Sequence, residues 1–158
     1  MRNLYDVDLM VKARIGASIT QLSENLKLFN TLSYENKNLY EEIDKTFKNI
    51  ITELGETNKV YQSYRDSYFD DYSKVEEKLK GDIIKLNSLR KMIDNSRGST
   101  SFDISLNEQI LKEVDYVIDK LGTAIEEVKE LPALSKRVKK EDYNKIIAKF
   151  EKDEEVSR

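Results

Sequence analysis

The amino-acid sequence predicts an all-α protein of long, heptad-patterned helices, arranged as an elongated antiparallel helical hairpin or bundle or as a coiled coil. Three observations support this fold class. Among 158 residues there are five Gly and one Pro, too few for the many turns of a β protein. Charged residues make up 36% of the chain with both signs interspersed, which is typical of solvated helices. Apolar residues also recur at alternating steps of three and four.

The first predicted helix follows an apolar frame that starts at Ile15 and ends at Leu54. The apolar positions of this frame are Ile15, Ile19, Leu22, Leu26, Phe29, Tyr40, Ile43, Phe47, Ile50 and Leu54. Poor helix formers fill the stretch from Asn30 to Asn36, so the chain either turns there or continues as one helix of about 75 Å in which Asn36 sets the register. We favour the continuous helix, because the frame is preserved and no Gly or Pro interrupts it.

Gly55 marks the next predicted boundary. Gly often follows the last turn of a helix, and Thr57 or Asn58 offers a cap for a new one, so we expect a tight reversal at this point. The alternative is an uninterrupted helix, because the same apolar frame continues past Gly55 as far as Val75.

A loop at residues 94–105 is predicted from a cluster of small and turn-forming residues. Ser105 and Glu108 then match a capping box, and the helix that follows has an apolar frame from Leu106 to Leu131 before Pro132 ends it. Residues 1–131 are therefore expected to form the helical bundle or coiled coil. Residues 132–158 should form a short amphipathic C-terminal helix and a polar tail that frays from Glu151 onward.

The composition does not favour an enzyme. The chain has no Cys and no His, which removes thiolate chemistry, histidine acid–base catalysis and the common zinc sites. The acidic pairs Asp6/Asp8, Asp70/Asp71 and Glu126/Glu127 lack the pattern of a calcium loop and are interpreted as solvated helix surface. We predict no catalytic residue, no metal and no cofactor. With no signal peptide or long apolar stretch in the sequence, we expect a soluble, intracellular protein.

Two groups of residues are candidate partner-binding sites. Four tyrosines three or four residues apart would share one side of a helix, and they form either a protein-binding patch or the margin of a core with hydroxyls reaching water. These are Tyr61, Tyr64, Tyr68 and Tyr72. The second group is Tyr143, Ile147 and Phe150, which lie among basic residues in the C-terminal segment. That segment either docks on the bundle, binds a partner helix or contacts an anionic membrane.

The function predicted first is a non-enzymatic helical protein–protein interaction module, such as an adaptor, a scaffold or a structural subunit. A 75 Å helix would be longer than the helices that follow it, which would leave an apolar stripe for a protein partner or a second copy. The alternatives are a small helical chaperone for a secreted or aggregation-prone client and a helical subunit of a nucleoprotein or viral particle. The net charge of -3 argues against binding to nucleic acid or to a membrane.

Overall fold

The computed structural model describes residues 2–32, 36–96 and 101–157, and within these ranges every regular element is a helix. The all-α prediction is therefore confirmed. The helices are α1 (Leu4–Phe29), α2 (Lys37–Asp66), α3 (Ser73–Asn95), α4 (Ser101–Ser135) and α5 (Lys140–Ser157).

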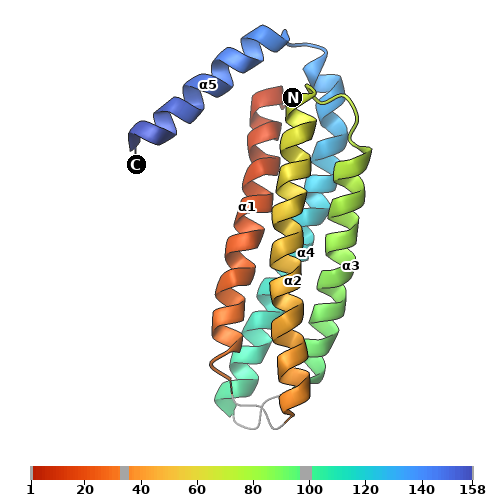
Figure 1. Ribbon diagram of the computed structural model, residues 1–158, viewed down its shortest axis with the longest axis vertical. Coiled ribbons are helices and arrows are strands. Elements are labelled where there is room, and N and C mark those ends of the chain that lie inside the picture. Colours follow the sequence, from red (N-terminus) through yellow and green to blue (C-terminus); the bar gives the residue numbers. More distant parts are fainter. Residues whose placement is uncertain (1, 33–35, 97–100, 158) are drawn as a thin grey trace.

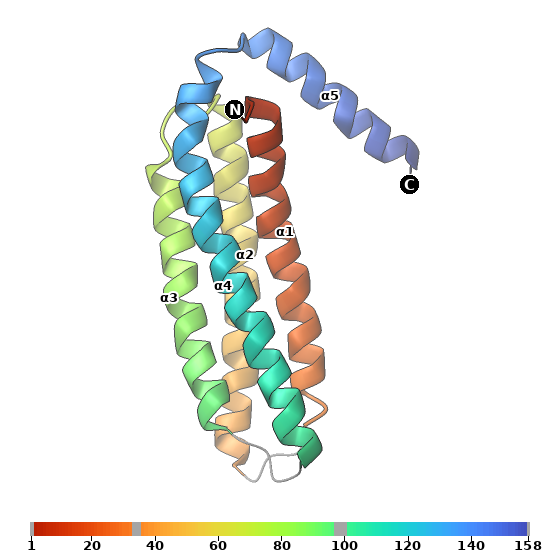
Figure 2. The same cartoon turned by 180° about the vertical axis from the view of Figure 1, so that it is seen from behind.

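Helices α1 to α4 form an antiparallel bundle in which each successive helix reverses direction (Figure 1). Helices α1 and α3 each pack against both α2 and α4. Each apolar face is therefore covered by two neighbours, and the predicted uncovered stripe on one long helix is wrong. Helix α5 begins at the end of the bundle that carries the N-terminus, and its far end stands apart from the four helices (Figure 1 and Figure 2).

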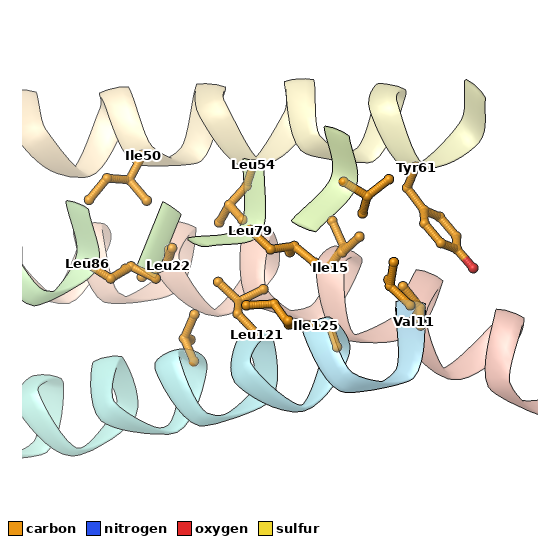
Figure 3. Packing of buried hydrophobic residues seen from close by; sticks show 14 of the residues in the cluster. Val11, Ile15, Leu22, Ile50, Leu54, Tyr61, Leu79, Leu86, Leu121 and Ile125 are labelled. Atoms are coloured by element: carbon orange, nitrogen blue, oxygen red, sulfur yellow. The ribbon is translucent and has the colours of Figure 1, made fainter. Parts of the chain in front are cut away.

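The middle of the bundle is filled by aliphatic side chains that point inward from all four helices (Figure 3). Fully buried examples are Ile15, Leu22, Ile50, Leu54, Leu79, Leu86 and Leu121. Each such side chain contributes about 1.5–3 kcal/mol by leaving water. The apolar frame predicted between Leu106 and Leu131 lies on the buried face of α4.

The continuous helix predicted across residues 30–36 is wrong. Helix α1 ends at Phe29, and α2 begins after Asn36, whose side chain accepts a hydrogen bond of 3.1 Å from the amide of Leu39. Asn36 is therefore a helix cap and not a register residue in a seam. The reversal also lets Phe29 contact the rings of Tyr40 and Phe47, at centroid distances of 5.2 and 5.8 Å. Residues 33–35 lie outside the described ranges.

The turn predicted at Gly55 is also wrong, because Gly55 lies inside α2. A Cβ atom built on Gly55, Gly16 or Gly81 would meet no other atom within 4 Å, so none of these positions needs glycine for a close helix contact. The chain instead reverses between Asp66 and Ser73, where the sequence predicted unbroken helix.

The predicted boundaries of the C-terminal half also differ from the structure. Helix α4 already begins at Ser101, so Ser105 and Glu108 lie inside it and do not form a capping box, and the predicted loop is too long. The part of that loop at residues 97–100 lies outside the described ranges. Pro132 lies within α4, which continues to Ser135. Helix α5 extends to Ser157, so it includes the polar segment from Glu151 onward; the fraying of that segment stays a prediction. None of the helices in the described ranges is long and apolar enough to cross a membrane.

Candidate functional site

The C-terminal end of α2 builds one side of the candidate site. The amide of Phe69 donates to the carbonyl of Tyr64 at 2.9 Å, and the amide of Tyr68 donates to that of Arg65, also at 2.9 Å. These bonds, with φ of 55° at Tyr68, form a Schellman motif, a helix ending that usually has Gly at the left-handed position. The motif also brings the Phe69 ring to 5.3 Å from the Tyr64 ring, edge to face. The left-handed tyrosine is held in place by these contacts.

This turn and α1 together hold the side chain of Tyr143, at the start of α5. The Tyr143 ring stacks on Tyr5 at 5.9 Å and lies 5.5 Å from the rings of both Tyr68 and Phe69. The Tyr68 hydroxyl donates a 2.7 Å hydrogen bond to the carbonyl of Val138, just before α5. The start of α5 is therefore attached to the bundle by one buried ring and its neighbours.

A buried carboxylate lies at the centre of this contact. Asp8, on α1, is 0% exposed and accepts hydrogen bonds of 2.6 Å from the hydroxyls of both Tyr61 and Tyr143. Its charge is balanced by Arg65, which is 6% exposed and whose Nε lies 2.9 Å from Asp8 Oδ1. We call Tyr5, Asp8, Tyr61, Arg65, Tyr68 and Phe69 the Tyr143 seat.

The environment of the seat keeps Tyr61 and Tyr143 protonated. Burial, together with the hydrogen bond to Asp8 and the charge of Asp8, raises the pKa of Tyr143 well above its ordinary value of about 10. Burial and the charge of Asp8 raise the pKa of Tyr61 in the same direction. Both hydroxyls therefore act as hydrogen-bond donors to the carboxylate at physiological pH, which is a structural role.

Pro132 explains a neighbouring contact. Proline has no N–H, so the carbonyl of Val128, four residues earlier in α4, loses its usual helical partner. The hydroxyl of Tyr64 donates to this carbonyl at 3.0 Å. The buried carbonyl is satisfied from α2, and this is why α4 continues past a proline that was expected to end it.

A second buried carboxylate ties the N-terminal segment to α4. Glu127 is 1% exposed and lies 3.0 Å from Arg2 Nη1 and 2.6 Å from Arg14 Nε. The interpretation of the acidic pairs as solvated surface is therefore wrong for Asp8 and Glu127, although it holds for their exposed neighbours Asp6 and Glu126. Asp8 lies four residues after Leu4 and three before Val11, so it shares the buried face of α1 with them. This spacing is the signal in the sequence that could have identified Asp8 as buried.

The predicted tyrosine patch does not occupy one side of a single helix, because α2 ends at Asp66. Tyr61 and Tyr64 are buried, Tyr68 is half-buried in the turn, and Tyr72 is half-buried at the start of α3. The expectation that their hydroxyls reach water is wrong for the first three, which donate to Asp8, to the Val128 carbonyl and to the Val138 carbonyl. The structure brings Tyr61 and Tyr68 close to Tyr143, which is far from them in the sequence.

The predicted residues of the C-terminal segment divide between two environments. Tyr143 is buried in its seat, Ile147 is half-buried, and Phe150 is 46% exposed. Ile146, which is also half-buried, lies one helical turn before Phe150. We call the part of α5 after Tyr143 the α5 arm. The far end of the arm stands apart from the bundle (Figure 2), whereas Ile147, near its start, still packs against the bundle core.

A surface hollow of about 440 Å³ lies between α2 and α3, and most of the residues that line it have charged side chains, including Glu53, Lys78 and Lys85. At its edge Asp82 is 2% exposed and accepts a 2.5 Å hydrogen bond from the Thr57 hydroxyl. Burial raises the pKa of Asp82.

The arrangement of acidic residues gives little support for metal chemistry. Among the residues that the structure describes, no three His, Cys, Asp or Glu side chains gather as metal ligands would. The seat can join helices and fix the origin of the α5 arm. Comparison with protein-family models, curated proteins and solved structures finds no match to this chain, so the functional argument comes from the fold and the seat alone.

Proposed function

We propose that this protein is a non-enzymatic helical protein–protein interaction module in which the bundle is a rigid base and the α5 arm is the docking element. The observation that carries the proposal is the exposure of Phe150, at 46%, on a helix whose far end stands apart from the bundle. Large apolar side chains on an unsupported helix cost free energy in water and gain it in an interface.

The positions of the exposed apolar residues favour the α5 arm over other surfaces as the docking element. Among the side chains that the structure describes, the other large hydrophobic ones that are exposed are Ile84 on α3 and Ile104 and Tyr116 on α4. These lie on helices packed in the bundle, and scattered residues of this kind are normal on a soluble protein. On α5, by contrast, Phe150 lies three residues after Ile147 and four after Ile146, so it shares one side of the helix with both.

The Tyr143 seat supports the same function by preorganising the arm. A docking helix that is already folded and held at a fixed origin loses less conformational entropy on binding than a free peptide. The buried contacts of Asp8, Tyr61 and Arg65 provide this fixed origin. The roles of adaptor, scaffold and structural subunit all use such an element.

The two alternative functions stay predictions. A chaperone would use a groove that accepts apolar client segments, whereas most of the residues that line the hollow between α2 and α3 have charged side chains. A nucleoprotein subunit would use a basic face, and the basic residues at 136–140 are followed directly by Glu141 and Asp142. A regular heptad coiled coil within the bundle is likewise still a prediction.

Photo-crosslinking in the cells that make the protein tests the proposal. A photoreactive phenylalanine analogue at position 150 should give one adduct of defined mass, and the same analogue at position 84 serves as the matched exposed control. The substitution Ile147→Asp should remove the adduct at position 150, since it places a charge on the apolar stripe. Equal, diffuse labelling at positions 150 and 84, or an adduct that survives Ile147→Asp, would contradict a docking role for the arm.

A further inference from the structure

We propose that the α5 arm closes onto the outer face of α1 and that this closed state competes with the partner for Phe150. The structure shows the open state, in which Phe150 is 46% exposed. The closed state is then an autoinhibitory contact within the chain. This inference rests on the proposed function and adds the regulation of the same surface.

The apolar side of α5 already faces the bundle. Tyr143 stacks on Tyr5 of α1 and binds Asp8, and Ile147, one turn later, packs against the bundle core. Phe150 follows Tyr143 by seven residues and Ile147 by three, so it lies on the same side of α5. Closure therefore extends an existing contact by one turn and needs no rotation of α5 about its own axis.

The direction of α5 makes α1 the helix that it meets on closing. In Figure 1 and Figure 2 both helices start at the same end of the bundle and run toward the other end, and α1 is the bundle helix nearest to α5. The stack of Tyr143 on Tyr5 sets the register of this parallel pair, an offset of about 138 residues between the two helices. Both helices rise about 1.5 Å per residue, so the offset holds along the pair. In the closed state Phe150 is level with Lys12.

The outer face of α1 has room for a ring at this level. A side chain at a parallel helix contact inserts between four residues of the facing helix, spaced i, i+3, i+4 and i+7. At the level of Lys12 these are Leu9, Lys12, Ala13 and Gly16, which we call the α1 face. Leu9 is half-buried and the other three are exposed. Because Ala13 and Gly16 have little or no side chain, the Phe150 ring fits between them.

Closure also explains the glycine in the α1 face. Glycine inside a helix costs stability relative to alanine. A Cβ atom at Gly16 would meet no other atom within 4 Å, so the packing of the open bundle does not require glycine there. In the closed state α5 approaches α1 at this position, and the missing side chain leaves space for the approach.

One pair of opposite charges fits the same register. Glu151 follows Phe150 on α5, Lys12 is level with Phe150 on α1, and both are exposed in the open state. On two parallel helices in contact these two positions fall on the same edge of the interface, whereas Lys149 falls on the opposite edge. Closure therefore brings Lys12 and Glu151 together.

The connection between α4 and α5 allows the movement. Residues 136–139 lie between the two helices, and Lys136, Arg137 and Lys139 are exposed. A few residues of this kind, next to the end of an element, can absorb the change in backbone angles that a hinge needs. A partner that binds only the open state is then weakened by the fraction of molecules that are closed.

Photo-crosslinking of the purified full chain tests the closed contact. The photoreactive phenylalanine analogue at position 150 should crosslink within the chain to residues 9–16, at an unchanged mass of about 18.5 kDa, as peptide mapping by mass spectrometry would show. The same analogue at position 84, which is 67% exposed on α3, should give no link to α1. Adducts from position 150 that join two molecules, or no link to residues 9–16, would overturn the closure.

A matched pair of glycine substitutions tests the α1 face. Gly16→Arg places a long side chain where Phe150 lies on closing, and Gly81→Arg does the same on α3, where a Cβ atom also meets nothing within 4 Å. The chain has no cysteine, so spin labels on Glu24→Cys and Lys152→Cys report one distance between α1 and α5.

We expect a short distance, from the closed state, that is lost in Gly16→Arg and kept in Gly81→Arg. The adduct of position 150 with its partner in cells should rise in Gly16→Arg, because more of the arm is then open. A distance distribution that Gly16→Arg leaves unchanged would contradict the closed state, and an unchanged yield of the adduct would contradict its inhibitory role.

Charge exchange tests the register. Lys12→Glu should lower the ratio of closed to open molecules about two- to fivefold, and adding Glu151→Lys should restore it. Lys27→Glu, at an exposed position of α1 beyond the contact, is the control and should leave the ratio unchanged. A double variant no more closed than Lys12→Glu would overturn the parallel register.

The two proposals fail in different ways. A defined adduct from position 150 to another protein in cells, without a link to residues 9–16 in the purified chain, would refute closure and leave the docking role standing. The link to residues 9–16 without any adduct in cells above that of position 84 would refute the docking role and leave closure as a contact within the fold.

Discussion

The middle of the bundle and the end that carries the Tyr143 seat are stabilised by different means. In the middle, aliphatic side chains from four helices meet, and each contact depends on shape and volume (Figure 3). At the seat end, a carboxylate, an arginine and several aromatic rings are buried together, and each contact depends on a particular partner. The middle thus explains why four helices pack, and the seat explains where the fifth helix starts.

The largest loss of stability should follow the removal of the Asp8 side chain. Asp8→Ala would leave the Arg65 charge and the hydroxyls of Tyr61 and Tyr143 buried without their acceptor, and we expect a loss of about 3–5 kcal/mol in the free energy of unfolding. Urea denaturation followed by circular dichroism measures this. Asp6→Ala, at an exposed position two residues earlier, should change stability by less than about 0.5 kcal/mol. Equal effects of the two substitutions would mean that the seat contributes no specific contact.

In the middle of the bundle, truncating one aliphatic side chain should be costly without disturbing α5. Leu54→Ala creates a cavity at a fully buried position, and we expect a loss of about 3 kcal/mol. Amide hydrogen exchange of α5, measured in conditions where the bundle stays folded, should not change. If this substitution made the amide hydrogens of α5 exchange faster than they do in the wild type, the two regions would not be separable.

A smaller and more local effect is expected for Tyr143→Phe. The ring stays in its seat, but the 2.6 Å hydrogen bond to Asp8 is lost, which should cost about 1 kcal/mol. The loss should concentrate in α5, whose amide hydrogens should exchange faster while those of the bundle are unchanged. Tyr116→Phe, on the exposed surface of α4, is the control and should leave α5 unaffected. A uniform increase in exchange over all helices would argue against a local attachment.

The smallest change in stability should come from substituting Asp82. Like Asp8 it is a buried carboxylate, but in the part of the chain that the structure describes no arginine balances its charge. Asp82 is bound by the Thr57 hydroxyl, and burial raises its pKa in the folded state. The folded protein then holds this proton more tightly than the unfolded chain, so its contribution to stability is present below the unfolded pKa of about 3.9 and is lost as pH rises through the folded value.

The substitution Asp82→Asn should therefore raise stability at pH 7, by less than about 1 kcal/mol, because an amide oxygen still accepts from Thr57 and no buried charge remains. Denaturation at several pH values between 3 and 7 measures the difference between variant and wild type. That difference should shrink towards low pH. A variant that is less stable than the wild type at neutral pH would show that the Asp82 charge is favourable in the fold.

Much of the fold follows from the sequence, but the helix ends do not. The scarcity of Gly and Pro and the steps of three and four predict helices, and the frame from Leu106 to Leu131 identifies the buried face of α4. The reversal after Asp66 was missed because its Schellman motif has Tyr68 where glycine is usual. Asn36 was misread because a cap and a polar seam position look alike when the apolar frame happens to continue across a turn.

The candidate site was only partly predictable for a similar reason. The tyrosine spacing drew attention to Tyr61 and Tyr68, and the amphipathic pattern of the C-terminal segment drew attention to Tyr143. Neither pattern could show that Tyr61 and Tyr143 converge on Asp8, since residues 8, 61 and 143 are brought together by the packing of three helices. Local pattern shows which face of a helix is apolar. It does not show which distant charge a buried arginine such as Arg65 will meet.

The proline inside α4 also limits the order in which this sequence can change over evolutionary time. As long as residue 132 is proline, the Val128 carbonyl depends on the hydroxyl of Tyr64. If proline is first replaced by a residue with an amide, that amide takes over the carbonyl and position 64 is free to lose its hydroxyl. The reverse order passes through a protein with a buried, unpaired carbonyl. Related chains are therefore expected to lose both residues or to keep the tyrosine wherever they keep the proline.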